Sequence, residues 1–114
     1  MNADRLKETR RRIESNDPEL DTLNIGPHSY HALDGDWELD GKLVGRNTNI
    51  QYLVLWDVRS NVRKDNFEAF CRGLACNKSI ERLSIWCCKL FDGEIFNSLT
   101  PFFEQNSNIH RLSV

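Results

Sequence analysis

Aliphatic residues recur along the chain in four short segments that share one spacing. The segments begin at Leu20, Ile50, Ile80 and Ile109, and each has an aliphatic residue at its first, fourth and sixth places. Alternate residues of a β-strand point to the same face, so the fourth and sixth places would face a core while the third, fifth and seventh places face away from it. The pattern predicts four short strands, which start at intervals of 30, 30 and 29 residues.

The stretches between these segments carry a second repeated pattern, which is typical of a helix. Aromatic residues occupy one column, and large apolar residues occupy another column seven residues later: Trp37, Phe67 and Phe96, then Val44, Leu74 and Phe103. Seven residues make two helical turns, so each pair lies on one face of a helix. Each unit is therefore predicted to be a strand, a loop and a helix, and neighbouring units to stack into a parallel sheet backed by helices.

Local signals place the ends of these helices. Asp65 is expected to be an N-cap, with Glu68 completing a capping box, and Thr100 is expected to cap a short helix that has Pro101 in its first turn. Gly41 and Gly45 make the helix that follows the first strand the weakest of the three. A polar column precedes the four segments by three residues: Asp17, Asn47, Asn77 and Asn106.

The third segment, IERLSIWCCKL, fits the pattern L-x-x-L-x-L-x-x-N/C-x-L at every defined place, with Cys88 in the Asn/Cys slot. The chain thus resembles the leucine-rich-repeat family, and its long period with full helices is similar to the ribonuclease-inhibitor-like subclass. The resemblance implies an α/β solenoid with a parallel β-sheet on the concave side and helices on the convex side, in about 3.5 repeats of 29–30 residues. Two segments depart from the pattern, because His28 and Val58 occupy the Asn/Cys slot, and Tyr30 and Ser60 the closing place.

The length of 114 residues predicts a single domain, 1–114. The last residue, Val114, falls within the fourth predicted strand. We expect a piece of a longer array with an uncapped C-terminal end. The alternative is a short protein in its own right, whose open strand edge would be available for self-association.

Composition and charge exclude several classes of protein. The chain is 39% hydrophobic and 28% charged, with a net charge of −2, which argues against general binding to nucleic acids or membrane surfaces. The run Arg10–Arg12 lies among Glu8, Glu14, Asp17 and Glu19, and is interpreted as a solvated helix face. Without an apolar stretch long enough for a signal peptide or a membrane span, the chain is expected to be cytoplasmic, with a nuclear location as the alternative.

Cysteine and histidine do not form a convincing metal or redox motif. Cys71 and Cys76 would point about 140° apart on a helix. Cys87 is expected on the concave face and Cys88 in the core, and adjacent cysteines lack the C-x-x-C arrangement of redox sites. The histidines fall in different units: His28, His31 and His110. We therefore expect no metal, no cofactor and no catalytic residue.

The predicted concave face is the best candidate for function. Place seven holds Trp56 and Trp86, place three holds Tyr52, Arg82 and Arg111, and place two holds Gln51 and Glu81. Tryptophan, tyrosine and arginine are enriched among the residues that contribute most to protein–protein binding. The sequence therefore predicts a non-catalytic protein–protein interaction module, with this set as the partner-binding residues. Alternatively, the two indoles only stack and cover the strand ends.

Two other functions stay open at this point. A regulator that activates GTPases would need a loop arginine, and Arg59 or Arg63 would supply it. A purely architectural role is the other alternative, in which the segment only extends a longer solenoid.

Overall fold

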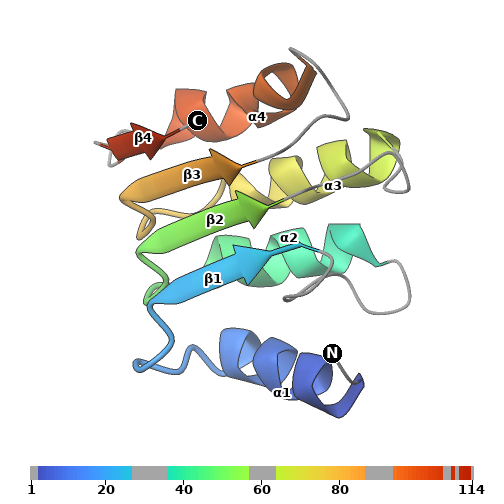
Figure 1. The fold of residues 1–114 in the computed structure, drawn as a ribbon, viewed down its shortest axis with the longest axis vertical. Coiled ribbons are helices and arrows are strands. Elements are labelled where there is room, and N and C mark those ends of the chain that lie inside the picture. The colour runs from blue at the N-terminus through green and yellow to red at the C-terminus, as the bar shows by residue number, and fades with distance from the viewer. Residues whose placement is uncertain are drawn as a thin grey trace.

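Helices and strands alternate along the chain. The computed structural model describes residues 3–26, 36–56, 64–86, 94–106, 109 and 111–113. The elements within these residues are, in order, α1 (Ala3–Glu14), β1 (Thr22–Ile25), α2 (Trp37–Arg46), β2 (Tyr52–Trp56), α3 (Lys64–Leu74), β3 (Arg82–Trp86), α4 (Glu94–Gln105) and β4 (Arg111–Ser113) (Figure 1). This alternation confirms the predicted α/β class.

The strands form one parallel sheet in the order β1-β2-β3-β4. Their register aligns Thr22 with Tyr52, Tyr52 with Arg82, and Arg82 with Arg111. These are the offsets of 30, 30 and 29 residues that the aliphatic pattern predicts, so each strand pairs with the strand of the next segment along the chain.

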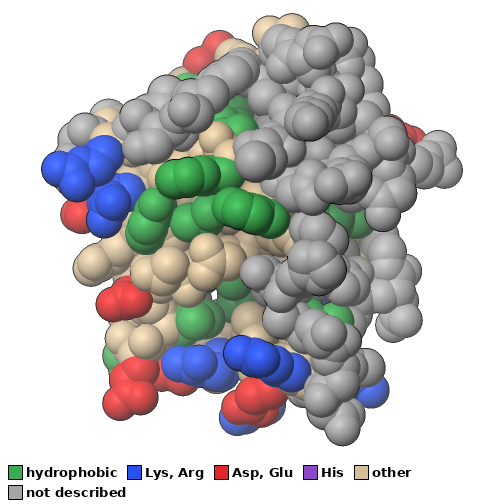
Figure 2. All heavy atoms as spheres, in the orientation of Figure 1, with side chains coloured by type: hydrophobic (Ala, Val, Ile, Leu, Met, Phe, Trp, Pro, Cys, Tyr) green, Lys and Arg blue, Asp and Glu red, His purple; other side chains and the backbone are tan. Residues whose placement is uncertain are grey.

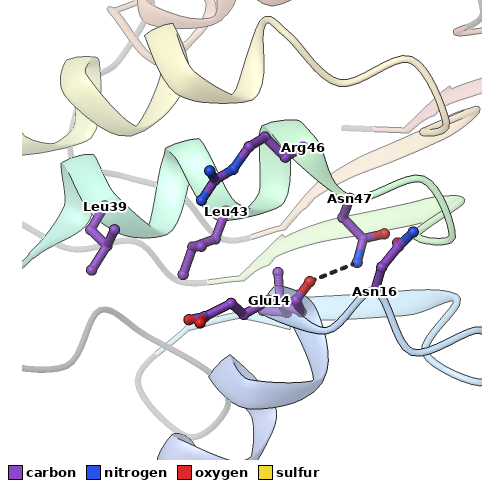
Figure 3. A pocket seen from close by; sticks show the side chains of 7 residues that line it. Glu14, Asn16, Leu39, Leu43, Arg46 and Asn47 are labelled. Carbon is purple, nitrogen blue, oxygen red and sulfur yellow. Dashed lines mark hydrogen bonds between the residues drawn. The ribbon is translucent and has the colours of Figure 1, made fainter.

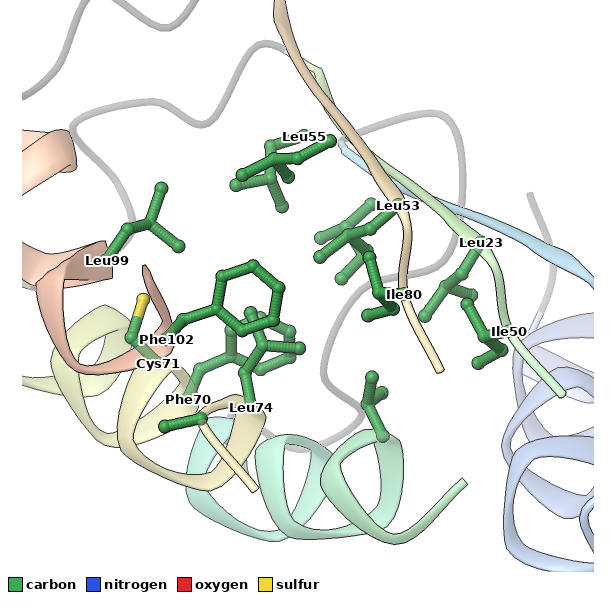
Figure 4. Packing of buried hydrophobic residues seen from close by; sticks show 14 of the residues in the cluster. Leu23, Ile50, Leu53, Leu55, Phe70, Cys71, Leu74, Ile80, Leu99 and Phe102 are labelled. Carbon is green, nitrogen blue, oxygen red and sulfur yellow. The ribbon is translucent and has the colours of Figure 1, made fainter. Parts of the chain in front are cut away.

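The core lies between the sheet and the helices α2, α3 and α4, which cover one face of the sheet (Figures 1 and 4). The strands contribute buried aliphatic residues such as Leu53 and Leu83, and the helices contribute Phe67, Phe70 and Phe102. Trp37 is half-buried and packs edge-on against Phe70, with 5.7 Å between ring centroids. Burial of apolar surface between these two layers is the main source of stability.

The predicted solenoid shape is wrong. The radius of gyration is 12.8 Å and the extents are 33 × 31 × 20 Å, which match the roughly 13 Å expected for a compact domain of this length. The aliphatic spacing requires each strand to pair with its neighbour and to be covered by a helix. A small four-stranded globule also meets that requirement.

Two predicted helix starts are also wrong. Helix α3 begins at Lys64, so Asp65 lies in its first turn instead of capping it. Helix α4 begins at Glu94, which places Thr100 and Pro101 inside the helix instead of at its start. The proline removes one backbone hydrogen bond, but Leu99 and Phe102 on either side of it are fully buried, and this packing keeps the helix continuous.

The glycines of α2 occupy its contact with α3. A Cβ atom on Gly45 would lie 2.2 Å from the carbonyl oxygen of Gly73, and one on Gly73 would lie 2.5 Å from the carbonyl carbon of Gly41. The backbones of the two helices therefore touch, with no room for a methyl group between them. Helix α2 forms despite its two glycines because they permit this close packing.

Buried asparagines join successive units. The side-chain amide of Asn77 donates hydrogen bonds to the carbonyl oxygens of Val44 at 2.9 Å and Asn47 at 3.0 Å. Its Oδ1 accepts the N–H groups of Ser79 at 2.7 Å and Ile80 at 2.8 Å. One side chain thus closes the turn before β3 and attaches it to the preceding unit.

The same arrangement recurs on both sides of Asn77. Asn47 donates to the carbonyl of Ile13 at 3.2 Å, and its Oδ1 accepts the N–H groups two and three positions later at 2.7 and 2.8 Å. Asn106 donates to the carbonyl of Asn77 at 2.7 Å. All three are buried. We call Asn47, Asn77 and Asn106 the asparagine ladder.

Asp17, the first member of the polar column, lies nearer the surface. Its carboxylate accepts the N–H of Glu19 at 2.9 Å and the Nε–H of Arg12 at 2.7 Å. These two hydrogen bonds lower the pKa of Asp17. At this position an aspartate accepts the backbone N–H group as the asparagines do, and Arg12 pairs with its negative charge.

The run Arg10–Arg12 is only partly a solvated face, which corrects the sequence prediction. Arg11 is exposed and pairs with Glu8. Arg10, by contrast, donates from Nε and Nη2 to the two carboxylate oxygens of Asp40 at 2.9 and 3.0 Å, and Asp40 is only 1% exposed. This bidentate ion pair attaches α1 to α2.

Replacement of Asn77 by alanine tests the asparagine ladder. Because the change leaves buried N–H and C=O groups without their amide partner, we expect the free energy of unfolding to fall by about 3 kcal/mol. Urea denaturation followed by circular dichroism measures it. The matched control is Asn24→Ala, an exposed asparagine on β1, which is expected to change stability by less than about 0.5 kcal/mol. Equal losses in the two variants would contradict the assigned role.

Replacement of Arg10 by alanine tests the ion pair to Asp40. The change removes the guanidinium from a buried carboxylate, so the free energy of unfolding should fall by about 3 kcal/mol. Thermal and urea unfolding measure the loss. Arg11→Ala is the control, and no measurable loss is expected because that side chain is exposed. If the two variants unfold alike, the ion pair does not stabilise α1.

Candidate protein-binding surface

No helix of the described residues covers the second face of the sheet, which we call the outer sheet face (Figure 1). Its outward positions are Thr22 and Asn24 on β1, Tyr52, Val54 and Trp56 on β2, Arg82, Ser84 and Trp86 on β3, and Arg111 on β4. Figure 2 shows hydrophobic side chains gathered in the middle of this face, with basic side chains to one side. The strand alternation that buries the aliphatic residues places these side chains on the opposite side.

Trp56 and Trp86 lie side by side at the C-terminal ends of β2 and β3. They are partners in the parallel register, and their rings stack with centroids 6.3 Å apart and an interplanar angle of 27°. Their exposed fractions are 43% and 50%, so each indole keeps much of its surface in water although it touches the other. The adjacency and exposure agree with the expectation from the 30-residue period.

Tyr52 and Arg82 form the second contact pair on this face. The Arg82 guanidinium carbon lies 4.2 Å from the centroid of the Tyr52 ring, which is a cation–π contact. The Tyr52 hydroxyl is 2.8 Å from Oγ of Ser84, which is only 3% exposed. Tyr52 is therefore held by Arg82 against its ring and by Ser84 at its hydroxyl group.

The remaining predicted residues border this group. Arg111 is exposed and lies opposite Arg82 in the register. Gln51 and Glu81 are exposed at the N-terminal ends of β2 and β3, where the Glu81 N–H donates to the carbonyl of Gln51 at 2.8 Å. The structure thus brings five of the predicted residues to the outer sheet face, in two contact pairs with Arg111 beside them, and places Gln51 and Glu81 exposed just before β2 and β3.

Sequence reasoning missed Ser84. Its place in the alternation puts it on the outer sheet face, but its burial depends on the Tyr52 side chain leaning from β2 across to β3. The one available signal was a small hydroxyl residue between an arginine and a tryptophan on the same strand.

A cleft between α1 and α2 is a second feature that the sequence did not predict (Figure 3). Its volume is about 540 Å³. It is lined by apolar side chains and by polar ones at its margin: Ile13, Leu39 and Leu43, with Glu14, Asn16, Arg46 and Asn47. The hydrogen bond from Asn47 to Ile13 crosses its inner end. The cleft was missed because α1 lies outside the repeated pattern.

Several sequence candidates lie outside the described residues: Cys87, Cys88, His28, His31, His110, Arg59 and Arg63. Cys71 is buried in the core, which raises the pKa of its thiol, whereas Cys76 is exposed just beyond α3. In the described part of the chain, no three His, Cys, Asp or Glu residues come together as metal ligands. Among the same residues, no helix combines the length and apolar character that crossing a membrane requires.

The fold is similar to that of a solved structure, "Leiomodin-1 Actin-Binding Site 2 (ABS2)". The match has a TM-score of 0.72 at 20% sequence identity, and it covers 94% of this chain and 60% of that one. At this identity the likeness concerns the fold alone, and the chain spans 60% of the length of the matched structure. No family model matches the chain, and neither does any curated protein.

These findings overturn the predicted membership of the leucine-rich-repeat family and of its ribonuclease-inhibitor-like subclass. A solved structure that the fold resembles is described as an actin-binding site, and no family model ties the chain to those repeats. The aliphatic spacing indicates parallel strands that pair with their neighbours and are covered by helices. A compact globule can have the same arrangement. The comparison does not support the GTPase-activating alternative either, and that function is not proposed.

Thiol labelling tests the placement of the cysteines. In a Cys87→Ser/Cys88→Ser background, Ellman's reagent at pH 8 should react rapidly with one thiol of the native protein, because Cys76 is exposed and Cys71 is buried. Denaturation in urea should then release the second thiol. Rapid reaction of both thiols in the native state would contradict the buried position of Cys71.

Proposed function

We propose that the chain is a non-catalytic protein-binding module whose outer sheet face binds a partner protein. The observation that carries the proposal is the pair of stacked indoles, Trp56 and Trp86, each close to half exposed. Large aromatic side chains in water are a free-energy cost that a partner relieves by covering them. Tryptophan is also the residue type most enriched among the side chains that dominate binding energy.

The geometry of this face favours binding over a purely structural role for the indoles. Two tryptophans that only covered the strand ends would be expected to bury most of their own surface. Here the stacking restrains both rings while their exposed fractions stay at 43% and 50%. A restrained aromatic pair loses little conformational freedom when a partner binds, so more of the contact energy appears as affinity.

The fold comparison supports a protein as the partner. The matched leiomodin-1 structure is described as an actin-binding site, and it shares the fold over 94% of this chain. We propose actin as the first partner to test, with the binding residues predicted from the sequence: Trp56, Trp86, Tyr52, Arg82, Arg111, Gln51 and Glu81.

Replacement of either indole tests the proposal. Trp56→Ala and Trp86→Ala should each weaken binding to monomeric actin by about 2 kcal/mol, or roughly 30-fold in Kd, because the truncated side chain no longer fills its contact. Isothermal titration calorimetry measures the affinity, and circular dichroism shows whether the variants fold.

The matched control is Leu39→Ala, which removes an exposed apolar side chain, 39% exposed, from α2 on the other layer. It should leave the affinity unchanged. If both tryptophan variants unfold, the indoles are structural and the proposal fails. Binding that survives both substitutions in folded protein would place the partner elsewhere.

A further inference from the structure

We propose that the outer sheet face selects a partner segment carrying carboxylates at one end and an apolar side chain about 13 Å away, a span of four strand residues. The carboxylates lie over Arg82 and Arg111, and the apolar side chain lies against Trp56 and Trp86. The inference rests on the proposed function and adds the chemistry of the partner.

The basic end of the site consists of two arginines on neighbouring strands. Arg82 on β3 and Arg111 on β4 are partners in the parallel register and are both exposed. Adjacent strands lie about 4.8 Å apart, so one carboxylate group can reach both guanidinium groups. Within the described residues, the ion pairs involve other side chains, at α1, α2 and the turn after α1. The two like charges side by side favour an anionic partner.

Tyr52 prepares Arg82 for this role. The ring lies 4.2 Å from the guanidinium carbon, and its hydroxyl contacts Oγ of the buried Ser84 at 2.8 Å. An arginine stacked on an aromatic ring keeps the N–H groups at its edge available for a carboxylate. The side chain is thus ordered before binding, which lowers the entropic cost of an ion pair on an exposed surface.

The apolar end lies four residues further along the same strand. Trp86 follows Arg82 on β3, and Trp56 occupies the same position on β2. Between the two ends the face is lined by Val54, which is half-buried, and by Ser84, which is buried. The Tyr52 ring leans across this stretch to reach Ser84, so an extended segment laid along the strands would contact that ring between the arginine and the indoles.

One acidic residue disfavours a partner carboxylate on the β1 side. Asp21 is exposed at the N-terminal end of β1, so it opposes carboxylates placed over that strand. Glu81 is exposed just before Arg82 at the N-terminal end of β3, so it offsets part of the charge of that arginine. Arg82 and Arg111 together carry more positive charge than Glu81 removes, so the β3–β4 side still attracts the acidic end of the partner.

A single-stranded nucleic acid is the competing partner class, because arginines beside stacked aromatic rings also suit phosphates and bases. Binding of that kind usually draws on many positive charges along a groove. This face presents two arginines beside two acidic residues, and the chain carries a net charge of −2. These charges favour an acidic peptide.

The experiment uses two ten-residue extended peptides without tryptophan. Each peptide has one phenylalanine. In the first peptide a pair of glutamates lies four residues before it, and in the second peptide a pair of lysines takes that place. Titration followed by the intrinsic tryptophan emission should show saturable binding of the glutamate peptide at least tenfold tighter than that of the lysine peptide.

The double variant Arg82→Glu/Arg111→Glu should reverse this preference. The matched control, Arg46→Glu/Arg72→Glu, changes two exposed arginines of the helix layer and should keep it.

Four results overturn the inference: no binding of the glutamate peptide, equal binding of both peptides, no effect of the charge reversal, or tighter binding of a dT10 oligonucleotide than of the glutamate peptide. Its failure is separable from that of the proposed function. If Trp56→Ala and Trp86→Ala abolish actin binding while the charge reversal leaves it intact, the face binds protein but the carboxylate preference is wrong. If the tryptophan variants bind actin normally, the outer sheet face is not the protein-binding surface.

Discussion

The asparagine ladder is the constraint on which the rest of the structure depends. Each turn between a helix and the next strand exposes backbone N–H and C=O groups that burial would leave without partners. A buried amide can satisfy these groups on both sides, as Asn77 does with Val44, Asn47, Ser79 and Ile80. The ladder thereby holds successive units at a fixed offset. That offset aligns Trp56 with Trp86 and Arg82 with Arg111 on the outer sheet face.

Much of the fold follows from spacing in the sequence. Alternate residues of a strand face the same side, so the aliphatic places of the segments beginning at Ile50 and Ile80 predict the buried aliphatic positions of β2 and β3. The burial of Ser84 does not follow from this alternation. The same geometry predicts that Trp56 and Trp86 are neighbours. Spacing does not encode the overall shape of the domain or the family to which it belongs, and the predicted solenoid and family were wrong for that reason.

Other features depend on contacts between side chains that a periodic sequence pattern does not predict. The Arg10–Asp40 ion pair joins residues thirty positions apart, and a charged sequence around Arg10 looks solvated until α2 packs against it. The contact of Tyr52 with Ser84 depends on a rotamer that crosses from one strand to the next. Pro101 stays inside α4 because the burial of its neighbours outweighs a lost hydrogen bond, a balance that local helix rules do not include.

The glycines between α2 and α3 have a consequence for the opposite side of the molecule. Helices usually pack 8–10 Å apart, whereas strands lie about 4.8 Å apart, so a wide helical layer bends the sheet that it covers. At Gly41, Gly45 and Gly73 the backbones touch, so α2 and α3 approach more closely than larger side chains would permit. Larger residues at these three positions would widen the helical layer behind β2 and β3, and would act on the surface that presents the tryptophans from the far side of the core.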